Sequence, residues 1–330
     1  MGGGYVMRLL GSLLGVLAAT LVAAGAGYTL LARSGKFQLS RDELVAAYAD
    51  PASKFVKVKG IEIHYKDEGQ GPPVVLFHGS FGSLHSWDGV VERLKNDHRL
   101  IRLDQAGVAL SSDVPPALEG LSLEDYVAAF FDAIGLDRTA VVGTSSGGII
   151  AYRFAAKYPE RVTKMVISNA PSAVVDNTAI ESNPKLDALI WLNDVLKHQP
   201  KIYWRAFLES LYGNPSRVTD AAVQRYYDIG RRVRPPPVQS MRSRVNDTAE
   251  IDGVLARVTT PTLLIWGVPD SVLPEAMGRQ LQRKLSAAKP ELIILNGTGH
   301  YPPVESPDAV AKLTRQFLQS TQEPPAQSKE

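Results

Sequence analysis

The chain has 330 residues, of which 45% are hydrophobic, so it is long and apolar enough to bury a large core. Its formal net charge is +2, and residues 1–36 contain Arg8, Arg33 and Lys36 but no acidic side chain. The remainder therefore carries 33 basic and 34 acidic side chains, a balance that excludes a broad basic surface for nucleic acid. Because the sequence has no cysteine, disulfides and thiol catalysis are excluded as well.

Residues 9–32 form a stretch without formal charge, and about 20 apolar residues suffice to cross a bilayer. We predict that segment 1–36 contains a membrane anchor. A cleaved signal peptide is the alternative, because the small residues at 23–27 resemble a cleavage site. Against this alternative, the apolar stretch continues through 28–31 and exceeds the ~7–15 residues of a signal h-region. The anchor is therefore the favoured interpretation.

Charges on the two sides of this stretch give conflicting indications of its orientation. Arg33, Lys36 and Arg41 follow the stretch and outnumber Arg8 before it, which by the positive-inside rule favours a cytoplasmic catalytic domain. The signal-like layout of the segment favours export instead. We expect an exported domain, periplasmic or extracellular, and keep two alternatives open: secretion after cleavage, and the cytoplasmic face of the membrane.

The next segments predict a connector and the start of a sheet. Residues 37–54 form the connector, in which Ser40 and Glu43 fit a capping box that opens a short helix. Residues 55–65 alternate apolar and polar side chains around a Lys-Gly pair, which predicts a hairpin.

Six apolar segments then alternate with helical stretches, which is typical of a parallel sheet covered by helices on both faces. They lie at about residues 74–77, 100–103, 139–142, 165–168, 262–266 and 292–295. Together with the hairpin they predict an α/β fold with a mostly parallel, eight-stranded sheet. The interval after the sixth strand is too long for a simple crossover. We therefore assign 173–258 to a helical cap, 55–172 and 259–318 to the core, and 319–330 to a disordered polar tail.

The hexapeptide at residues 143–148, Gly-Thr-Ser-Ser-Gly-Gly, lies between a predicted strand and a predicted helix. A nucleophile elbow needs glycine two residues either side of its serine, because the sharp turn brings the backbones too close for a Cβ. Gly143 and Gly147 therefore select Ser145 as the candidate nucleophile. The backbone N–H of Ser146 is then expected to face an oxyanion.

Other strand ends carry further candidate groups. The strand near residue 77 leads into a turn at 78–82, His-Gly-Ser-Phe-Gly, where the N–H of Ser80 or Phe81 completes an oxyanion hole. The two late strands end close to Asp270 and His300. Parallel sheets collect functional side chains at this edge, so we expect these groups to meet.

These motifs occur in the order that is characteristic of the α/β-hydrolase superfamily, and the chain resembles its capped esterases, lactonases and carbon–carbon bond hydrolases over about residues 55–318. The resemblance implies a triad of Ser145 as nucleophile, Asp270 as acid and His300 as base, with no metal or organic cofactor. One departure is Ala109, which stands where relatives usually carry a second glycine. The motifs are His78-Gly79, residues 104–111, the Ser145 elbow, Trp266-Gly267 with Asp270, and Gly299-His300 followed by Glu305 and Pro307.

Each candidate also has a structural interpretation. Asp270 is well placed to cap the following helix, and Asp176 is the fallback acid. We interpret His78 as structural, because it lies beside the oxyanion turn, and Asp104 and Glu305 as carboxylates that fix loops.

The chemistry of the nucleophile narrows the reaction. Epoxide hydrolases and dehalogenases of this superfamily use a carboxylate nucleophile, because serine would leave an inert ether. Ser145 therefore favours acyl transfer on a small-molecule carboxylic ester or lactone. Two alternatives stay open: a carbon–carbon bond hydrolase of diketo acids, for which a cap arginine would bind the substrate carboxylate, and a non-catalytic hydrolase-like binding protein.

The cap contains aromatic side chains that are candidates for lining a pocket between cap and core. Simple packing within the cap is the alternative for each of them. The candidates for substrate binding are Trp191, Tyr203, Trp204 and Phe207. A basic stretch is either an anion site or a solvated helix face, and it consists of Arg225, Arg231, Arg232, Arg234, Arg242 and Arg244.

Overall fold

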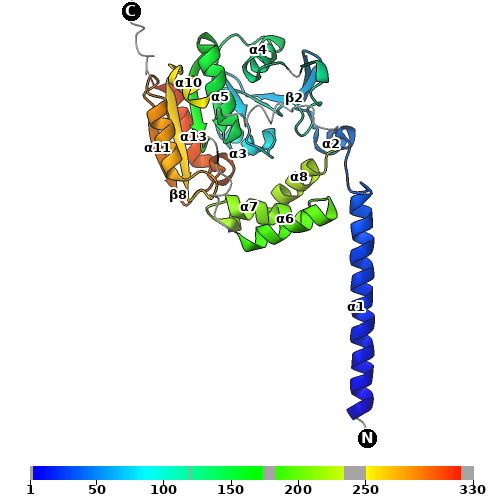
Figure 1. Ribbon diagram of the computed structural model, residues 1–330. Helices are drawn as coiled ribbons and strands as arrows, with labels where there is room; N and C mark the ends of the chain where they lie inside the picture. The colour runs from blue at the N-terminus through cyan, green and yellow to red at the C-terminus, as the bar shows by residue number, and fades with distance from the viewer. Residues whose placement is uncertain (1–2, 119, 174, 176–182, 234–249, 321–330) are drawn as a thin grey trace, which may run out of the picture.

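The computed structural model describes residues 3–118, 120–173, 175, 183–233 and 250–320. A single sheet lies at the centre of the molecule, and the long helix α1 (Gly3–Arg33) projects away from it (Figure 1). The strands are β1 (Ser53–Val58), β2 (Ile61–Glu68), β3 (Pro73–Phe77), β4 (Arg99–Leu103), β5 (Thr139–Thr144), β6 (Val162–Ser168), β7 (Thr262–Val268) and β8 (Glu291–Asn296).

The eight strands form one sheet in the order β1-β2-β4-β3-β5-β6-β7-β8. Strands β3 to β8 run parallel, whereas β2 pairs antiparallel with both β1 and β4. The predicted hairpin turns at Lys59 and Gly60, which both have positive φ as a tight two-residue turn requires. The predicted eight-stranded, mostly parallel sheet is confirmed.

Alternating side chains of the strands supply two apolar layers. In β3, Val75 and Phe77 contribute to the larger core, and Val74 and Leu76 contribute to the smaller one. The larger core is covered by α4 (Leu123–Ala133), α5 (Ser146–Lys157), α10 (Ile251–Ala256) and α11 (Glu275–Lys284). The smaller core is covered by α3 (Asp88–Leu94) and α13 (Pro307–Gln319). Because strand side chains point alternately to both faces, each face needs its own helices.

Three helices form the cap over the carboxyl edge of the sheet: α6 (Pro184–Leu196), α7 (Lys201–Leu211) and α8 (Asp220–Gly230). They enclose a separate apolar cluster that includes Tyr203 and Trp204. The assigned cap range of 173–258 also contains α10, but Ile251, Val254 and Leu255 of that helix pack in the larger core. The last helix of the insertion therefore belongs to the core, because its apolar face is buried against α5.

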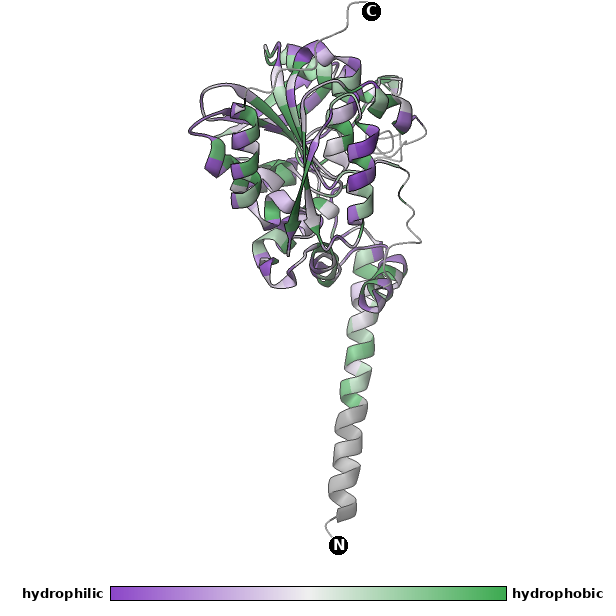
Figure 2. Ribbon diagram, turned by 90° about the vertical axis from the view of Figure 1, so that its left-hand side faces the viewer, coloured by the Kyte–Doolittle hydropathy of each residue, from purple (hydrophilic) through white to green (hydrophobic). Residues whose placement is uncertain are grey.

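The N-terminal segment is one continuous helix, and the stretch Val16–Arg33 has a mean hydropathy of 1.5 with only 6% of it buried. Its described turns are largely apolar in Figure 2. The connector helix α2 (Arg41–Tyr48) starts with the predicted capping box: Ser40 Oγ accepts from Glu43 N, and Glu43 Oε2 accepts from Ser40 N.

The connector is hydrogen-bonded to the cap. Leu39 N donates to Arg231 O at 2.9 Å, and Val233 N donates to Leu39 O at 2.8 Å. Tyr48 Oη donates to Asp228 Oδ2 at 2.6 Å. The cap is therefore joined both to the core and to the segment that follows α1.

Candidate active site

Ser145 lies at the sharp turn between β5 and α5. Its backbone has φ 52° and ψ −126°, a conformation that L-residues rarely adopt. A Cβ at Gly143 would lie 2.3 Å from Gly147 O, and a Cβ at Gly147 would lie 2.1 Å from Phe77 O. Both positions therefore require glycine, and the geometry is that of a nucleophile elbow.

The structure brings the three predicted triad side chains together. His300 Nε2 lies 3.0 Å from Ser145 Oγ, and His300 Nδ1 lies 2.8 Å from Asp270 Oδ2. All three come from strand ends, after β5, β7 and β8, and the side chain of Asp270 is fully buried. This is the hydrogen-bond chain that a nucleophile, a base and an orienting carboxylate need.

Asp270 is held as an anion by several donors. Val272 N and Leu273 N donate to Oδ1 at 2.7 and 2.9 Å, and Asn169 Nδ2 donates to Oδ2 at 2.7 Å. Burial alone raises the pKa of Asp270, but His300, Leu273 N and Asn169 outweigh it, and the pKa lies below its usual value. Asn169 was not among the residues predicted for the site; its one signal in the sequence is that it is a polar residue directly after β6.

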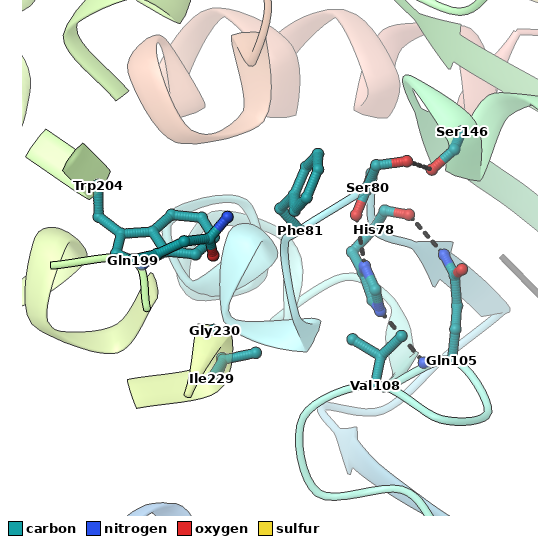
Figure 3. Close-up of a pocket in the computed structure, with 11 residues that line it drawn as sticks. His78, Ser80, Phe81, Gln105, Val108, Ser146, Gln199, Trp204, Ile229 and Gly230 are labelled. Atoms are coloured by element: carbon teal, nitrogen blue, oxygen red, sulfur yellow. Dashed lines mark hydrogen bonds between the residues drawn. The ribbon is translucent and has the colours of Figure 1, made fainter. Parts of the chain in front are cut away.

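A cavity of about 160 Å³ adjoins the nucleophile between core and cap (Figure 3). The predicted oxyanion residues Ser80, Phe81 and Ser146 line it, and Ser80 Oγ donates to Ser146 Oγ at 3.1 Å. Ser145 itself is not in the lining, but a Cβ on the lining residue Gly79 would lie 3.0 Å from Ser145 Cβ. The cavity therefore begins directly beside the nucleophile.

His78 supports the oxyanion turn, as its structural interpretation predicts. Its Nδ1 lies 2.8 Å from Gly79 O, and Gln105 N donates to its Nε2 at 3.1 Å. These contacts define the tautomer with hydrogen on Nδ1. Burial lowers the pKa of His78, so the ring is neutral and acts as a spacer between the turn and the loop that holds Gln105.

The two loop carboxylates also have several partners. Asp104 accepts from Leu84 N and Leu110 N at 2.8 and 3.2 Å. Glu305 accepts from Gly299 N at 2.7 Å, immediately before His300, and from the cap backbone at Gly213 N at 3.0 Å. Glu305 therefore joins the loop that carries the histidine to the cap.

The cap aromatics do not all reach the cavity. Trp204 lines it and packs against Phe81, with ring centroids 6.2 Å apart. Phe207 also packs against Phe81, at 5.4 Å, and Tyr203 stacks on Phe207 at 6.0 Å, so both form a second layer. Trp191 is 67% exposed and lies outside the cavity lining, since its part of α6 faces away from the core. The structure therefore does not bring Trp191 to this pocket.

Cap arginines in the described residues are paired with carboxylates. Arg232 Nη2 lies 3.0 Å from Asp113 Oδ1, and Arg225 Nη1 lies 3.5 Å from Asp88 Oδ2. Arg231, directly after α8, pairs with Asp228 in the last turn of that helix. These three arginines lie outside the cavity lining. The remaining members of the basic stretch, Arg234, Arg242 and Arg244, and the fallback acid Asp176 lie outside the described residues.

Ala109, at the unusual position of the loop after β4, has a φ of +46°. The loop thus keeps a left-handed backbone that glycine adopts more easily, despite its alanine. Within the described part of the chain, no group of three or more His, Asp or Glu side chains is arranged to hold a metal ion.

Comparisons with known sequences agree with this architecture. A family model described as alpha/beta hydrolase fold matches residues 72–194, and one described as TAP-like protein matches residues 237–330. Epoxide hydrolase 3 of Xenopus tropicalis is 27% identical over 80% of this chain and 76% of its own length. The 2-hydroxy-6-oxo-2,4-heptadienoate hydrolase of Pseudomonas putida is 26% identical over 80% of this chain and 95% of its own length.

Solved structures share the fold. The crystal structure of a membrane phospholipase A, described as a novel bacterial virulence factor, aligns with a TM-score of 0.62 at 23% identity, over 93% of this chain and 97% of its own. Residues 37–330 make up only 89% of the chain, so this alignment includes part of the N-terminal segment. The chain has the α/β-hydrolase fold. Its site places a serine, a histidine and an aspartate at strand ends, within hydrogen-bond distance of one another.

Proposed function

We propose that the protein is a serine hydrolase that cleaves a carboxylic ester or lactone through an acyl-enzyme. The observation that carries this proposal is the bridge formed by His300, 3.0 Å from Ser145 Oγ on one side and 2.8 Å from Asp270 on the other. A base in that position can take the proton that Ser145 Oγ must lose when it attacks a carbonyl carbon.

The proposed reaction proceeds in two halves. Ser145 Oγ attacks the carbonyl carbon as its proton passes to His300 Nε2, and Asp270 stabilises the imidazolium. The N–H groups of Ser146 and of Ser80 or Phe81 bind the oxyanion. The tetrahedral adduct collapses, the bond to the alcohol oxygen breaks, and His300 protonates that oxygen. Water, deprotonated by His300, then releases the carboxylic acid and restores Ser145.

Ester chemistry fits this site better than epoxide opening, although the Xenopus tropicalis relative is named an epoxide hydrolase. Attack of serine on an epoxide carbon gives an ether, which has no carbonyl for water to attack. An acyl group on Ser145 keeps its carbonyl and can be hydrolysed. The cavity of about 160 Å³ is below the ~300–1,000 Å³ of drug-sized ligand pockets, which supports a short acyl or alcohol group.

Carbon–carbon bond hydrolysis of a diketo acid is the second candidate, and the Pseudomonas putida relative, named a 2-hydroxy-6-oxo-2,4-heptadienoate hydrolase, favours it. A substrate carboxylate would then need a cationic partner. The cap arginines Arg225, Arg231 and Arg232 have carboxylate partners of their own. We therefore keep ester cleavage as the first candidate and test both.

We also infer that α1 anchors the protein in a membrane, with the hydrolase domain on the exported side. The helix is continuous from Gly3 to Arg33, and the stretch from Val16 has apolar side chains exposed along its length. Its last turn is joined to the cap, since Arg33 Nε donates to Val195 O at 2.9 Å. Retention of the helix, rather than cleavage within residues 23–27, is consistent with this attachment.

The test of the reaction uses the full chain in detergent with p-nitrophenyl esters from acetate to decanoate, lactones and a diketo acid. We expect the highest kcat/KM on short esters and loss of turnover in Ser145→Ala. Ser146→Ala is the matched control, because it keeps the backbone N–H and should retain activity within about tenfold. Turnover of the diketo acid alone would favour the second candidate. Failure of a fluorophosphonate to label Ser145 would support a non-catalytic binding protein.

A further inference from the structure

The outer face of the cap exposes large apolar side chains. Trp191 is 67% exposed, Ile202 57% and Ile190 46%. Ile190 and Trp191 lie on α6, and Ile202 lies at the start of α7, where the next residues, Tyr203 and Trp204, are buried. We call Ile190, Trp191 and Ile202 the outer cap face. Helix α7 thus presents Trp204 to the cavity and Ile202 away from the core, and α6 packs inside the cap through Leu186 and Leu189.

The outer cap face lies where α1 meets the globular part of the molecule. Arg33 is bound to Val195 O, one turn after Trp191 on α6. The ring of His198 lies 6.3 Å from Tyr28 and 5.0 Å from Phe37. Figure 1 shows α6 beside the upper end of α1, so the face lies at the level of the last turns of that helix.

The length of the apolar stretch of α1 determines the depth at which the outer cap face would lie relative to a bilayer. At about 1.5 Å per residue, residues 9–32 span roughly 36 Å, slightly more than a hydrocarbon core of about 30 Å. The end of the apolar stretch is therefore expected at the boundary between acyl chains and headgroups. Tryptophan favours this boundary, because its ring is apolar and its N–H is polar.

Exposed side chains of both charges lie near the outer cap face, with Asp187 and Asp194 of α6 among them. Lys36, Lys197 and Lys201 are exposed, and no ion pair joins them to a carboxylate within the ranges that the structure describes. Lysines at this level can bind anionic headgroups while their methylene stems lie along the apolar surface. The three lysines outnumber the two aspartates of α6, and an apolar centre whose surroundings carry a small excess of positive charge fits an anionic lipid surface.

We propose that the outer cap face rests on the bilayer in which α1 is anchored, with Ile190, Trp191 and Ile202 in the interface and Lys197 and Lys201 among anionic headgroups. This contact rests on the proposed anchoring by α1 and is independent of the proposed reaction. Because α7 also carries Trp204, which lines the cavity, the membrane contact holds that part of the cavity wall in place from outside. The cap is then a second membrane-binding element beside α1.

The four tryptophans offer a direct test. Trp87 and Trp266 are 0% exposed and Trp204 is 2% exposed, so Trp191 is the one that a quencher reaches from outside. The full chain is reconstituted in vesicles of phosphatidylcholine and phosphatidylglycerol, with or without brominated acyl chains. We expect brominated lipid to quench the wild type and Trp191→Phe to lose that quenching, with unchanged hydrolysis of a soluble ester by Trp191→Phe.

A vesicle flotation assay, carried out on the same samples, distinguishes between the possible negative results of the quenching experiment. Flotation without quenching would retain α1 as an anchor and overturn the contact of the outer cap face. Loss of both flotation and quenching would overturn the membrane anchor and the contact of the outer cap face together. The proposed reaction is tested separately, by hydrolysis of a soluble ester. Equal quenching in Trp191→Phe would mean that a different tryptophan is responsible and would also overturn the proposal.

A second copy of the chain is the competing occupant. In that case Trp191 would become protected from aqueous iodide as the protein concentration rises in detergent, and brominated lipid would not quench it. A double variant, Lys197→Glu with Lys201→Glu, provides the remaining check. We expect it to lose much of the quenching in anionic vesicles while it still floats, and full quenching would contradict the headgroup contact.

Discussion

On the sheet side of the candidate site, Asp270 is held by several hydrogen bonds, whereas the cap bounds the cavity with Gln199, Trp204, Ile229 and Gly230, and the ring of Trp204 packs against Phe81. Asp270 has three donors besides His300, from Asn169 and the backbone of Val272 and Leu273. Phe81, by contrast, contacts the cap through ring packing against Trp204 and Phe207.

This difference indicates that the sheet side determines the rate of the reaction and that the cap side determines which substrates are preferred. Directional bonds hold reacting atoms within a few tenths of an ångström, as proton transfer requires. Packed rings define a volume, and the volume changes when one ring is replaced. We therefore expect changes on the sheet side to affect kcat for every substrate and changes on the cap side to affect the order of substrates.

The largest expected effect is that of Asp270→Asn. The amide would present its NH₂ or its oxygen to His300 without a negative charge, so the imidazole would lose both its tautomer and its counter-charge. We expect kcat to fall by about 10⁴-fold on all esters, as in other triads. Steady-state kinetics of the full chain would measure the loss. A decrease below tenfold would identify another acid, with Asp176 the first to be replaced.

A smaller loss is expected when one donor to Asp270 is removed. Asn169→Ala deletes the bond of 2.7 Å to Oδ2, and a hydrogen bond to a charged group contributes roughly 1.5–3 kcal/mol, so kcat should fall at least about tenfold. KM should not change, because Asn169 does not line the cavity. A matched decrease in fluorophosphonate labelling would locate the effect at Ser145. An effect on KM alone would contradict a role through Asp270.

The difference between the two sides also explains what could be predicted from the sequence. Ser145, Asp270 and His300 follow strands, and parallel strands bring their carboxyl ends to one edge, so order along the chain is enough to place them. Trp191 and Trp204 lie on helices of an insertion whose rotation depends on tertiary packing. Their sequence surroundings are alike, yet one is exposed and the other buried. Asn169 was missed because one polar residue after a strand carries no distinctive spacing.

On the cap side, Phe81→Ala should change the order of substrates. The ring of Phe81 closes the cavity towards Trp204 and Phe207, so its removal enlarges the acyl site while the backbone N–H at that position stays. Each newly buried methylene contributes about 0.8 kcal/mol, or about a fourfold gain in kcat/KM. The p-nitrophenyl ester series should therefore shift to longer chains. A uniform loss across the series would instead indicate damage to the oxyanion turn.

Acid stability provides a measure of the sheet side that is independent of activity. Burial raises the pKa of Asp270, but its partners lower it below the ordinary 3.8. A group whose folded pKa is depressed stabilises the protein above its unfolded pKa and loses this contribution as the pH falls through the folded value. From pH 6 to pH 3, the free energy of unfolding should therefore fall more for the wild type than for Asp270→Asn. Parallel curves in urea denaturation would contradict a depressed pKa.

The smallest expected effect is at the contact between the loop after β4 and the cap. Ala109 has a φ of +46°, and its carbonyl accepts from Arg232 of the cap at 2.9 Å. A left-handed conformation costs alanine roughly 1–2 kcal/mol, and glycine would relieve this strain. The greater freedom of glycine in the unfolded chain offsets about half of the stabilisation that results. Ala109→Gly should therefore stabilise the fold by about 0.5–1 kcal/mol and raise Tm by about 1–4 °C.

The control for this prediction is the same substitution in an ordinary helical conformation. Ala188 is exposed in the interior of α6, where Ala188→Gly should destabilise by about 0.5–1 kcal/mol. Opposite signs for the two variants in thermal unfolding would show that Ala109 is strained. Equal losses of stability in the two variants would mean that alanine is favourable at position 109. The methyl group of Ala109 would then stabilise the contact between the loop after β4 and Arg232 of the cap.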